Sequence, residues 1–264
     1  MYNYENSDEK KSGNMRWMPS EAMSFNGKVI ENEIRGYQTL FVSGREIARK
    51  SLLKQDIDGR DGVMVLAEKL SPRSIFVKYI LEGDSAGAFR NKYNKLNILL
   101  QGNDVPITFA DEPSHTFYGT VEDAEKVANG ALVAISSFSI FCADPFKYGI
   151  DTSISGTGQV TIKKELPYEV LPTEIIITPL ERVSKITVKN NKTGMQIVVE
   201  NTFDGNTPLY IRNKIGEIVY KGIKRPDIMH WSSDFEDFLL HNDDVVSVIP
   251  ATAKITVRVG DKLL

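Results

Sequence analysis

The amino-acid sequence predicts a mainly β protein of two domains with one helix, and three observations support this fold class. From Ser24 onward, most apolar residues lie in short runs or alternate with polar residues, as in strands. Turn-forming clusters of glycine, asparagine and aspartate separate these runs. The stretch from Ile150 to Gln159 is rich in glycine, serine and threonine, which is typical of a linker. We therefore expect an N-terminal arm over residues 1–22, a first domain over 23–149 and a second over 150–264.

The composition is that of a soluble globular protein. The 264 residues are 41% hydrophobic and 25% charged, with a formal net charge of −3. No basic block indicates nucleic-acid binding, and the polar N-terminus does not fit a signal peptide. The best apolar run, Ala131 to Ala143, is too short for a membrane-spanning helix. Cys142 is the only cysteine, so we expect a buried thiol, no internal disulfide and synthesis in a reducing cytoplasm.

The first domain opens with a polar stretch and continues with strand signals. Residues 1–22 lack periodicity and predict a flexible arm, although Trp17 and Met18 favour an arm that orders on a partner. Asn26-Gly27 predicts a tight hairpin, and the cluster from Asp58 to Gly62 predicts a turn. Strands are predicted at Thr39–Ser43, Val63–Ala67, Arg73–Leu81, Val105–Phe109, Thr116–Val121 and Ala131–Cys142.

The predicted strand Arg73–Leu81 is apolar on both faces. Ile75, Val77 and Tyr79 share one face, while Phe76 and Ile80 lie on the other. Such a strand is either buried on both sides or forms part of a subunit contact. These five residues are our candidate interface, and burial within the sheet accounts for them equally well.

One helix is predicted between this strand and the next. Asp84 or Ser85 can cap its start, and Gly102 can end it. Its apolar residues repeat at spacings of four, three and four, which places them in one stripe that should pack on a sheet. The stripe consists of Phe89, Tyr93, Leu96 and Leu100.

The second domain carries only strand signals. Asn190 to Gly194 forms a predicted hairpin loop between apolar runs, and Asn213 to Gly216 forms another turn. Near the C-terminus Ile255, Val257 and Val259 alternate with polar residues, as in a strand with one buried face. Short strands separated by turns predict a β-sandwich. The strands are expected at Lys185–Val188, Met195–Val199, Leu209–Ile211, Glu217–Tyr220 and around Ile255–Val259.

No pattern predicts an enzyme active site or a bound metal. The segment Asp56–Gly62 departs from calcium-loop spacing, because Arg60 replaces one ligand and Ala67 replaces the final glutamate. Asp111 and Glu112 point to opposite faces of an extended chain, so they do not form an acid–base pair. Zinc motifs and phosphate-binding loops are absent from the sequence. Gly83–Gly87 has the Gly-x-Ser-x-Gly spacing of a nucleophile elbow, but we expect its Ser85 to cap the following helix. We expect no catalytic residue, no metal and no cofactor.

Trp231 lies among acidic residues and is open to two interpretations. An indole beside carboxylates can stack on a sugar ring, which keeps a carbohydrate-binding module or lectin that contacts host cell-wall glycan as the main alternative function. Because tryptophan's large apolar area is usually buried, we interpret Trp231 as a core residue of the second domain. A cell-wall hydrolase is the less favoured alternative, since no site residue can be named for it.

Three segments, taken together, resemble the distal tail protein family of siphophages. The first contains Asp58, Gly59, Arg60, Asp61 and Gly62, followed by strand, helix and strand. The second, Val105–Gly119, contains Phe109, Asp111, Glu112, Pro113, Tyr118 and Gly119. The third, Phe138–Gly149, contains Cys142, Asp144, Pro145, Tyr148 and Gly149. The C-terminal half matches the family only in length and β-rich character.

The resemblance implies a structural protein without enzymatic activity. Its first domain would be a β-sandwich with one α-helix that assembles into a hexameric ring, and its second a galectin-like β-sandwich outside the ring. The ring would join the major tail (tube) protein to a tail-associated tip protein, with receptor-binding proteins at its rim, at the distal end of the virion's tail. The second half is too short for the inserted carbohydrate-binding module of some family members.

Two physical expectations follow for such a ring. Its subunit contacts should bury on the order of 2,000 Å² or more. Its bore should carry acidic or neutral groups where the genome passes, because lysine and arginine would hold phosphates. The net charge of −3 permits such a bore. We expect neither specific nucleic-acid recognition nor membrane contact.

Overall fold

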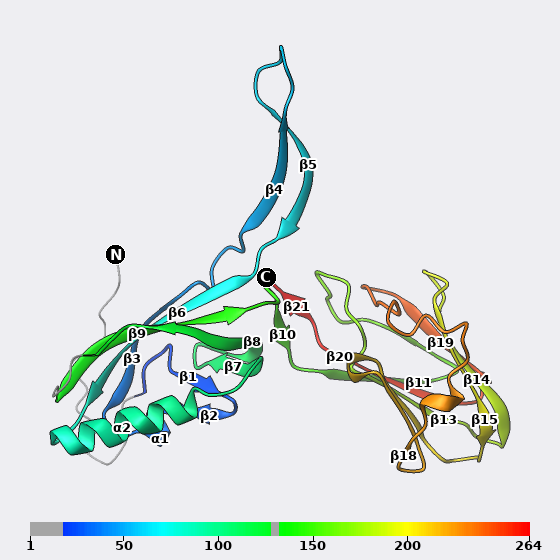
Figure 1. Cartoon of the computed structure of the whole chain (residues 1–264). Coiled ribbons are helices and arrows are strands. Elements are labelled where there is room, and N and C mark those ends of the chain that lie inside the picture. The colour runs from blue at the N-terminus through cyan, green and yellow to red at the C-terminus, as the bar shows by residue number, and fades with distance from the viewer. Residues whose placement is uncertain (1–17, 128–131) are drawn as a thin grey trace. The chain divides into compact units, whose positions relative to one another are not determined.

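The computed structural model describes residues 18–127 and 132–264 and is mainly β, as the sequence predicts (Figure 1). The chain divides into two compact units. Unit 1 comprises the residues up to Pro113 together with Phe117–Pro145, and unit 2 comprises Ser114–Thr116 and Phe146–Leu264. The change of unit after Pro145 lies just before the predicted boundary at Gly149. Most of the predicted arm, including Trp17, and the start of the strand predicted at Ala131 lie outside the described residues.

Unit 1 is built on an antiparallel sheet whose strands follow the order β2-β1-β7-β8-β9-β6-β3. The long strand β8 pairs with β7 at Gly119 and, further along, with β9 at Thr120, so it joins the two halves of the sheet. The strands are β1 (Met23–Phe25), β2 (Lys28–Val29), β3 (Tyr37–Ser43), β6 (Arg73–Glu82), β7 (Val105–Phe109), β8 (Glu112–Ala124) and β9 (Val133–Cys142). A single turn of helix, α1 (Ile30–Glu33), follows β2.

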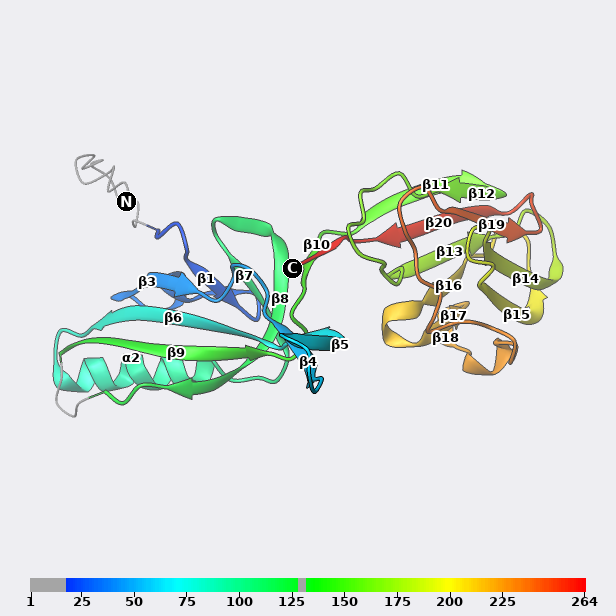
Figure 2. The same cartoon turned by 90° about the horizontal axis from the view of Figure 1, so that it is seen from above.

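The predicted helix is confirmed as α2 (Ala86–Leu99). The Ser85 side chain caps it by accepting a hydrogen bond from the Ala88 backbone N–H at 3.2 Å. Phe89 and Leu96 are buried, which confirms the predicted apolar stripe. Figure 2 shows α2 lying along β6 and β9, whose inner faces it covers. The tight hairpin is also confirmed, because Asn26 has a positive φ of 50° between β1 and β2.

The burial pattern of β6 corrects the candidate interface that was expected from the sequence. Ile75, Val77 and Tyr79 are buried in the core of unit 1 and are not available to another chain. Phe76 is 38% exposed on the opposite face, and Ile80 is partly exposed beside it. The alternation predicted for this strand is therefore right, but only one of its faces can contact a partner.

Unit 1 also contains a strand that the sequence patterns did not predict. β4 (Lys50–Asp56) pairs with β5 (Val63–Leu70) as a separate two-stranded sheet. The predicted turn from Asp58 to Gly62 is the tip of this hairpin, where Gly59 and Gly62 have positive φ angles. Figure 1 shows the hairpin extending away from the main sheet of unit 1.

Unit 2 is a β-sandwich, as predicted. A six-stranded sheet, β11-β20-β13-β16-β17-β18, and a four-stranded sheet, β12-β19-β14-β15, enclose one apolar core. The six strands are β11 (Thr152–Thr157), β20 (Lys254–Val259), β13 (Glu174–Thr178), β16 (Leu209–Arg212), β17 (Glu217–Tyr220) and β18 (Ile223–Lys224). The four are β12 (Gln159–Thr161), β19 (Val245–Ile249), β14 (Val183–Asn190) and β15 (Gln196–Phe203).

Short elements complete unit 2. β10 (Lys147–Gly149) pairs with β21 (Lys262–Leu263) and with His115–Thr116 of β8. Two turns of 3₁₀ helix, η1 (Asn213–Ile215) and η2 (Pro226–Ile228), lie in its connections. In the described part of the chain, no helix is long and apolar enough to cross a membrane.

Two predictions for unit 2 are wrong. The candidate linker from Ile150 to Gln159 is mostly strand β11, which pairs along its length with β20 and packs Ile154 against the core. Its small polar residues belong to the edge of a sheet, where few side chains need burial. Trp231 is 90% exposed and not a core residue, since phenylalanines such as Phe203 and Phe238 fill the sandwich instead.

Candidate assembly surfaces

The hairpin of unit 1 exposes apolar side chains along its whole length. We call Lys50–Leu70, which comprises β4, β5 and their turn, the ribbon. Every residue of its two strands except Leu70 is exposed. Its exposed large apolar residues are Leu52, Leu53, Ile57, Val63, Met64, Val65 and Leu66. These side chains have no core of their own, so the ribbon has the composition of an element that packs against another molecule.

Both faces of the ribbon are apolar. Successive residues of a strand point to opposite faces, so Val63 and Val65 lie on one face and Met64 and Leu66 on the other. An irregularity in the pairing between Leu53 and Lys54 adds twist near the middle. An isolated two-stranded hairpin is only marginally stable in water, and contact with a partner on either face would stabilise it.

Arg73 anchors the base of the ribbon to unit 1. Its Nε donates to the carbonyl oxygen of Pro145 at 3.0 Å, and its Nη1 donates to the carbonyl oxygens of Gly44 at 2.9 Å and Glu46 at 3.0 Å. The guanidinium also lies over the ring of Phe117. Burial lowers the pKa of Arg73. One buried side chain thus ties the segment that leads into the ribbon to the start of β6.

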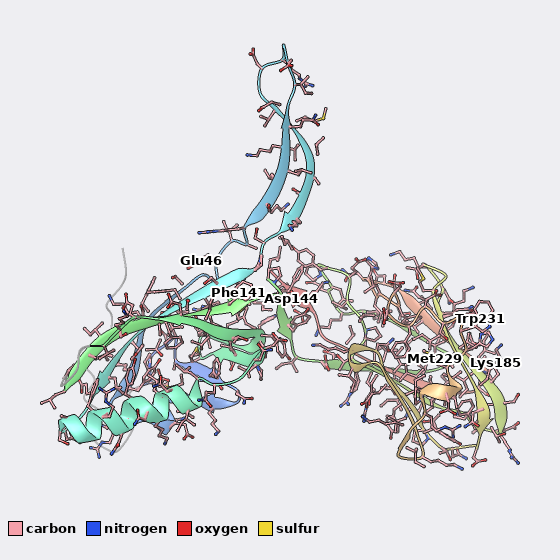
Figure 3. The ribbon with its side chains drawn as sticks, viewed as in Figure 1. Glu46, Phe141, Asp144, Lys185, Met229 and Trp231 are labelled. Atoms are coloured by element: carbon pink, nitrogen blue, oxygen red, sulfur yellow. The ribbon has the colours of Figure 1, made fainter. Side chains whose placement is uncertain are left out.

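Gly44 is required for this anchorage. Its φ is 91°, and a Cβ there would lie 2.1 Å from the carbonyl oxygen of Ser74. Only glycine allows the chain to pass β6 this closely. A cleft of about 460 Å³, lined by Glu46, Arg49 and Arg73 among others, lies at this base (Figure 3 labels Glu46).

A second anchor involves Asp111, one of the family-signature residues. Arg45 forms two hydrogen bonds of 2.8 Å with the Asp111 carboxylate and a contact of 3.3 Å with Glu21. Its guanidinium lies 4.4 Å from the ring centre of Phe109. Burial lowers the pKa of Arg45, but the ion pair with Asp111 outweighs it and raises the pKa overall. This cluster joins the chain after β3 to the turn between β7 and β8.

The solvent-facing side of the unit 1 sheet carries a second set of exposed apolar residues. We call this set the outer face. Cross-strand pairs such as Ile80–Ile135 and Ser74–Phe141 place its members on one side of β3, β6 and β9. Figure 3 labels Phe141 there. The outer face consists of Phe41, Phe76, Val133, Ile135 and Phe141, which are between 38% and 60% exposed.

Four other family-signature residues, namely Gly119, Cys142, Tyr148 and Gly149, have roles within the fold. A Cβ at Gly119 would lie 2.8 Å from Ile140 and 2.9 Å from the Cys142 sulfur, so β8 and β9 need a glycine there. Cys142 is fully buried, and burial raises its thiol pKa to about 11. In unit 2 a Cβ at Gly149 would lie 2.2 Å from the Asp261 carboxylate, and Lys214 lies over the ring of Tyr148. Asp58–Gly62, at the tip of the ribbon, are instead exposed.

Neither surface has the arrangement of a catalytic or metal site. Among the described residues, no three His, Cys, Asp or Glu side chains converge to hold a metal ion. Asp111 and Glu112, the adjacent acids of the sequence, lie at the β7–β8 turn, where Asp111 is held by Arg45. The arrangement supports adhesion between proteins, because it consists of apolar side chains presented on anchored backbone.

Two family models match the chain, one in each half. The phage tail protein RIFT-related domain matches residues 26–139, and the C-terminal domain of the siphovirus-type tail component matches residues 168–259. The distal tail protein of Bacillus phage SPP1 is 36% identical over 118 residues, which are 44% of this chain and 47% of that protein. The match therefore spans about half the length of this curated relative.

Solved structures share the fold. The crystal structure of SPP1 Dit, described as a paradigm of the hub adsorption apparatus in phages that infect Gram-positive bacteria, has a TM-score of 0.77 at 22% identity, and the match covers 92% of this chain and 99% of that one. The activated baseplate of phage P2 with Ca gives a TM-score of 0.55 at 12% identity, covering 84% and 90%. The same baseplate with Sr gives 0.52 at 11% identity, covering 85% and 90%.

Proposed function

Since the chain belongs to the siphophage distal tail protein family, we propose that six copies of it close into a ring at the distal end of a phage tail. The observation that carries this proposal is the ribbon, an anchored hairpin with exposed apolar residues on both faces. A closed ring needs two different surfaces on each copy, because its contacts are head-to-tail. Unit 1 offers two such surfaces, the ribbon and the outer face.

In the proposed ring, the ribbon of one copy packs on the outer face of the next. The large apolar side chains of the ribbon strands and of the outer face are 38–60% exposed. If three on one face of the ribbon and three on the outer face each lose about 70 Å² of apolar surface, the contact gains roughly 10 kcal/mol before the costs of association. Those costs are about 4–15 kcal/mol for two free partners, so the ribbon contact alone is marginal and ring closure has to add to it. This balance fits a ring that assembles cooperatively.

The function of the ring would be mechanical. One side would bind the major tail protein of the tube, the other a tail-associated tip protein, and receptor-binding proteins would attach at the rim. SPP1 Dit is described as part of a hub adsorption apparatus, which supports this position for the present chain. The bore would let DNA pass without recognising its sequence. We assign no enzymatic activity, since joining tail components requires only complementary surfaces. The galectin-like character of unit 2 stays a prediction.

Native mass measurement and negative-stain imaging of the purified full chain test the proposal. We expect a species of about six times 29.6 kDa and ring-shaped particles with a central opening. Labelling of purified virions with an antibody against the chain should mark the tail end distal to the capsid. A protein that stays monomeric up to millimolar concentration and is missing from purified virions would contradict the proposal.

A further inference from the structure

Trp231 is an exposed aromatic side chain that ring assembly by unit 1 leaves unexplained. It lies in unit 2 and is 90% exposed. An indole is usually buried, because its large apolar area is unfavourable in water. An indole that is held in solvent keeps its flat apolar face available for stacking on a ligand.

The backbone around Trp231 is fixed. Met229 pairs with Val199 of β15, and the His230 N–H donates to the Val198 carbonyl at 2.8 Å. On the other side, the Ser233 hydroxyl accepts from the Val198 N–H at 3.0 Å and donates to its carbonyl. The Ser233 N–H also donates to the His230 carbonyl at 3.1 Å, which closes a turn with Trp231 at its tip. The indole is thus presented by a preorganised turn along the edge of the four-stranded sheet.

The turn that carries Trp231 and the neighbouring strand β15 also present polar side chains. The His230 imidazole lies 5.4 Å from it between ring centres, tilted by 38°, and shares a hydrogen bond of 2.8 Å with the Ser232 hydroxyl. Glu200 follows Val199 on β15 and forms an ion pair of 3.0 Å with Lys185 on β14. This ion pair lowers the pKa of Glu200, so its carboxylate is an ionised acceptor at neutral pH.

This combination distinguishes a sugar from a protein partner. An aromatic anchor in a protein interface normally lies within a contiguous apolar patch, whereas the exposed large apolar residue nearest to Trp231 in the sequence is Met229, which is 40% exposed. A pyranose ring offers an apolar C–H face for the indole and hydroxyls for the surrounding donors and acceptors. Figure 3 shows Trp231, Met229 and Lys185 at the same end of unit 2.

We propose that Trp231, with His230, Ser232 and the Glu200–Lys185 pair, forms a binding site for a neutral hexopyranose unit of a cell-surface polysaccharide. The indole stacks on the C–H face of the sugar, while the polar groups hydrogen-bond its hydroxyls. A single shallow site of this kind binds weakly, with a dissociation constant on the order of millimolar. Several copies in one assembly would strengthen attachment to a repetitive polymer by avidity.

Intrinsic fluorescence of the full chain tests this site. The sequence contains two tryptophans, so a Trp17→Phe background leaves Trp231 as the sole indole reporter. The probes are maltotetraose, cellotetraose and chitotetraose at up to 20 mM, a range chosen on the order of the expected affinity. We expect a saturable change in Trp231 emission with at least one probe.

Ligand-observed NMR measures sugar binding to the unmodified chain and does not depend on tryptophan fluorescence. Trp231→Ala and Trp231→Leu should each weaken it by roughly tenfold or more, because leucine is apolar but cannot stack. Ile223→Ala, a change at another exposed apolar residue of unit 2, should leave it unchanged. The native mass measurement of the ring does not involve this site. A chain that binds none of the sugars would therefore leave the ring proposal unaffected.

Three outcomes overturn the sugar site. One is the absence of saturable binding by all three probes in both measurements. Another is binding that survives Trp231→Ala. The third is binding of the chain to a tail or host protein that is lost in the Trp231→Ala variant but kept in the Trp231→Leu variant. Such a pattern would assign the indole to an apolar contact with a protein.

Discussion

Replacing two ribbon leucines should separate ring assembly from folding. Leu53 is 60% exposed and Leu66 is 51% exposed, so neither contributes much to the stability of the isolated chain. In Leu53→Thr/Leu66→Thr, threonine keeps the β propensity of the strands while removing most of the apolar surface. The free energy of unfolding of the isolated chain should change by no more than about 1 kcal/mol.

The same double substitution should have a large effect on association. If each leucine buries about 70 Å² more in the ring, its loss costs about 1.75 kcal/mol at 25 cal/mol per Å², or roughly 3.5 kcal/mol for both. That weakens each subunit contact by a factor of about 400. Sedimentation velocity over a range of concentrations measures the shift from ring to monomer.

The matched control is Leu180→Thr in unit 2, where the leucine is 57% exposed. It removes similar apolar surface outside both proposed interface surfaces, so we expect the ring-to-monomer midpoint to be unchanged. Equal midpoints for the double variant and the unmodified chain would refute the role of the ribbon. If the double variant loses its far-ultraviolet circular dichroism signal, it has not folded. The single variant Val65→Thr, which changes one strand only, would then take its place.

Three further predictions concern the residues that hold unit 1 together. Arg73→Met should lower the free energy of unfolding by about 2–4 kcal/mol in chemical denaturation, because three backbone carbonyls lose their hydrogen-bond donor. An unchanged denaturation midpoint would contradict the role of Arg73 as an anchor of the ribbon. Gly119→Ala should destabilise the folded chain by about 1–3 kcal/mol, because its Cβ would lie 2.8 Å from Ile140. The control Gly87→Ala in α2 meets no atom within 4 Å and should be neutral or slightly stabilising. Equal thermal unfolding midpoints for the two variants would refute this prediction. Burial raises the pKa of the Cys142 thiol from 9.0 to about 11. The buried neutral thiol should therefore contribute fully to the stability of the fold below pH 9, and this contribution should decline as the pH rises towards 11. A thiol reagent at pH 8 should label Cys142 only after unfolding, and rapid labelling of the folded chain would contradict the burial.

Elements with strong local signals were predictable from the sequence. The helix α2 has a serine cap and a single apolar stripe, and both depend on residues within one or two turns of each other. The β1–β2 hairpin depends on Asn26-Gly27, whose preference for positive φ is a property of the residues themselves. The alternation in β6 also gave the correct faces, although the sequence could not say which face α2 covers.

Elements that depend on distant partners were not predictable. β4 carries lysine, glutamine and aspartate among its leucines and contains a register irregularity, so it lacks the alternation of a half-buried strand. The residues of β11 have the composition of a linker, because small polar residues of this kind are ordered only by pairing with β20, about a hundred residues later in the chain. The exposure of Trp231 is not predictable from the average burial of tryptophan, because it depends on the turn that presents the side chain to solvent.

Hydrogen exchange of the ribbon amides tests the central claim most directly. The claim is that the apolar ribbon becomes buried only when one copy joins the next. The backbone amides of β4 and β5 should exchange rapidly in the dilute monomer and become protected at concentrations where the ring forms, while amides in the core of unit 2 stay equally protected in both. Ribbon amides that exchange at the same rate in monomer and ring would contradict the claim.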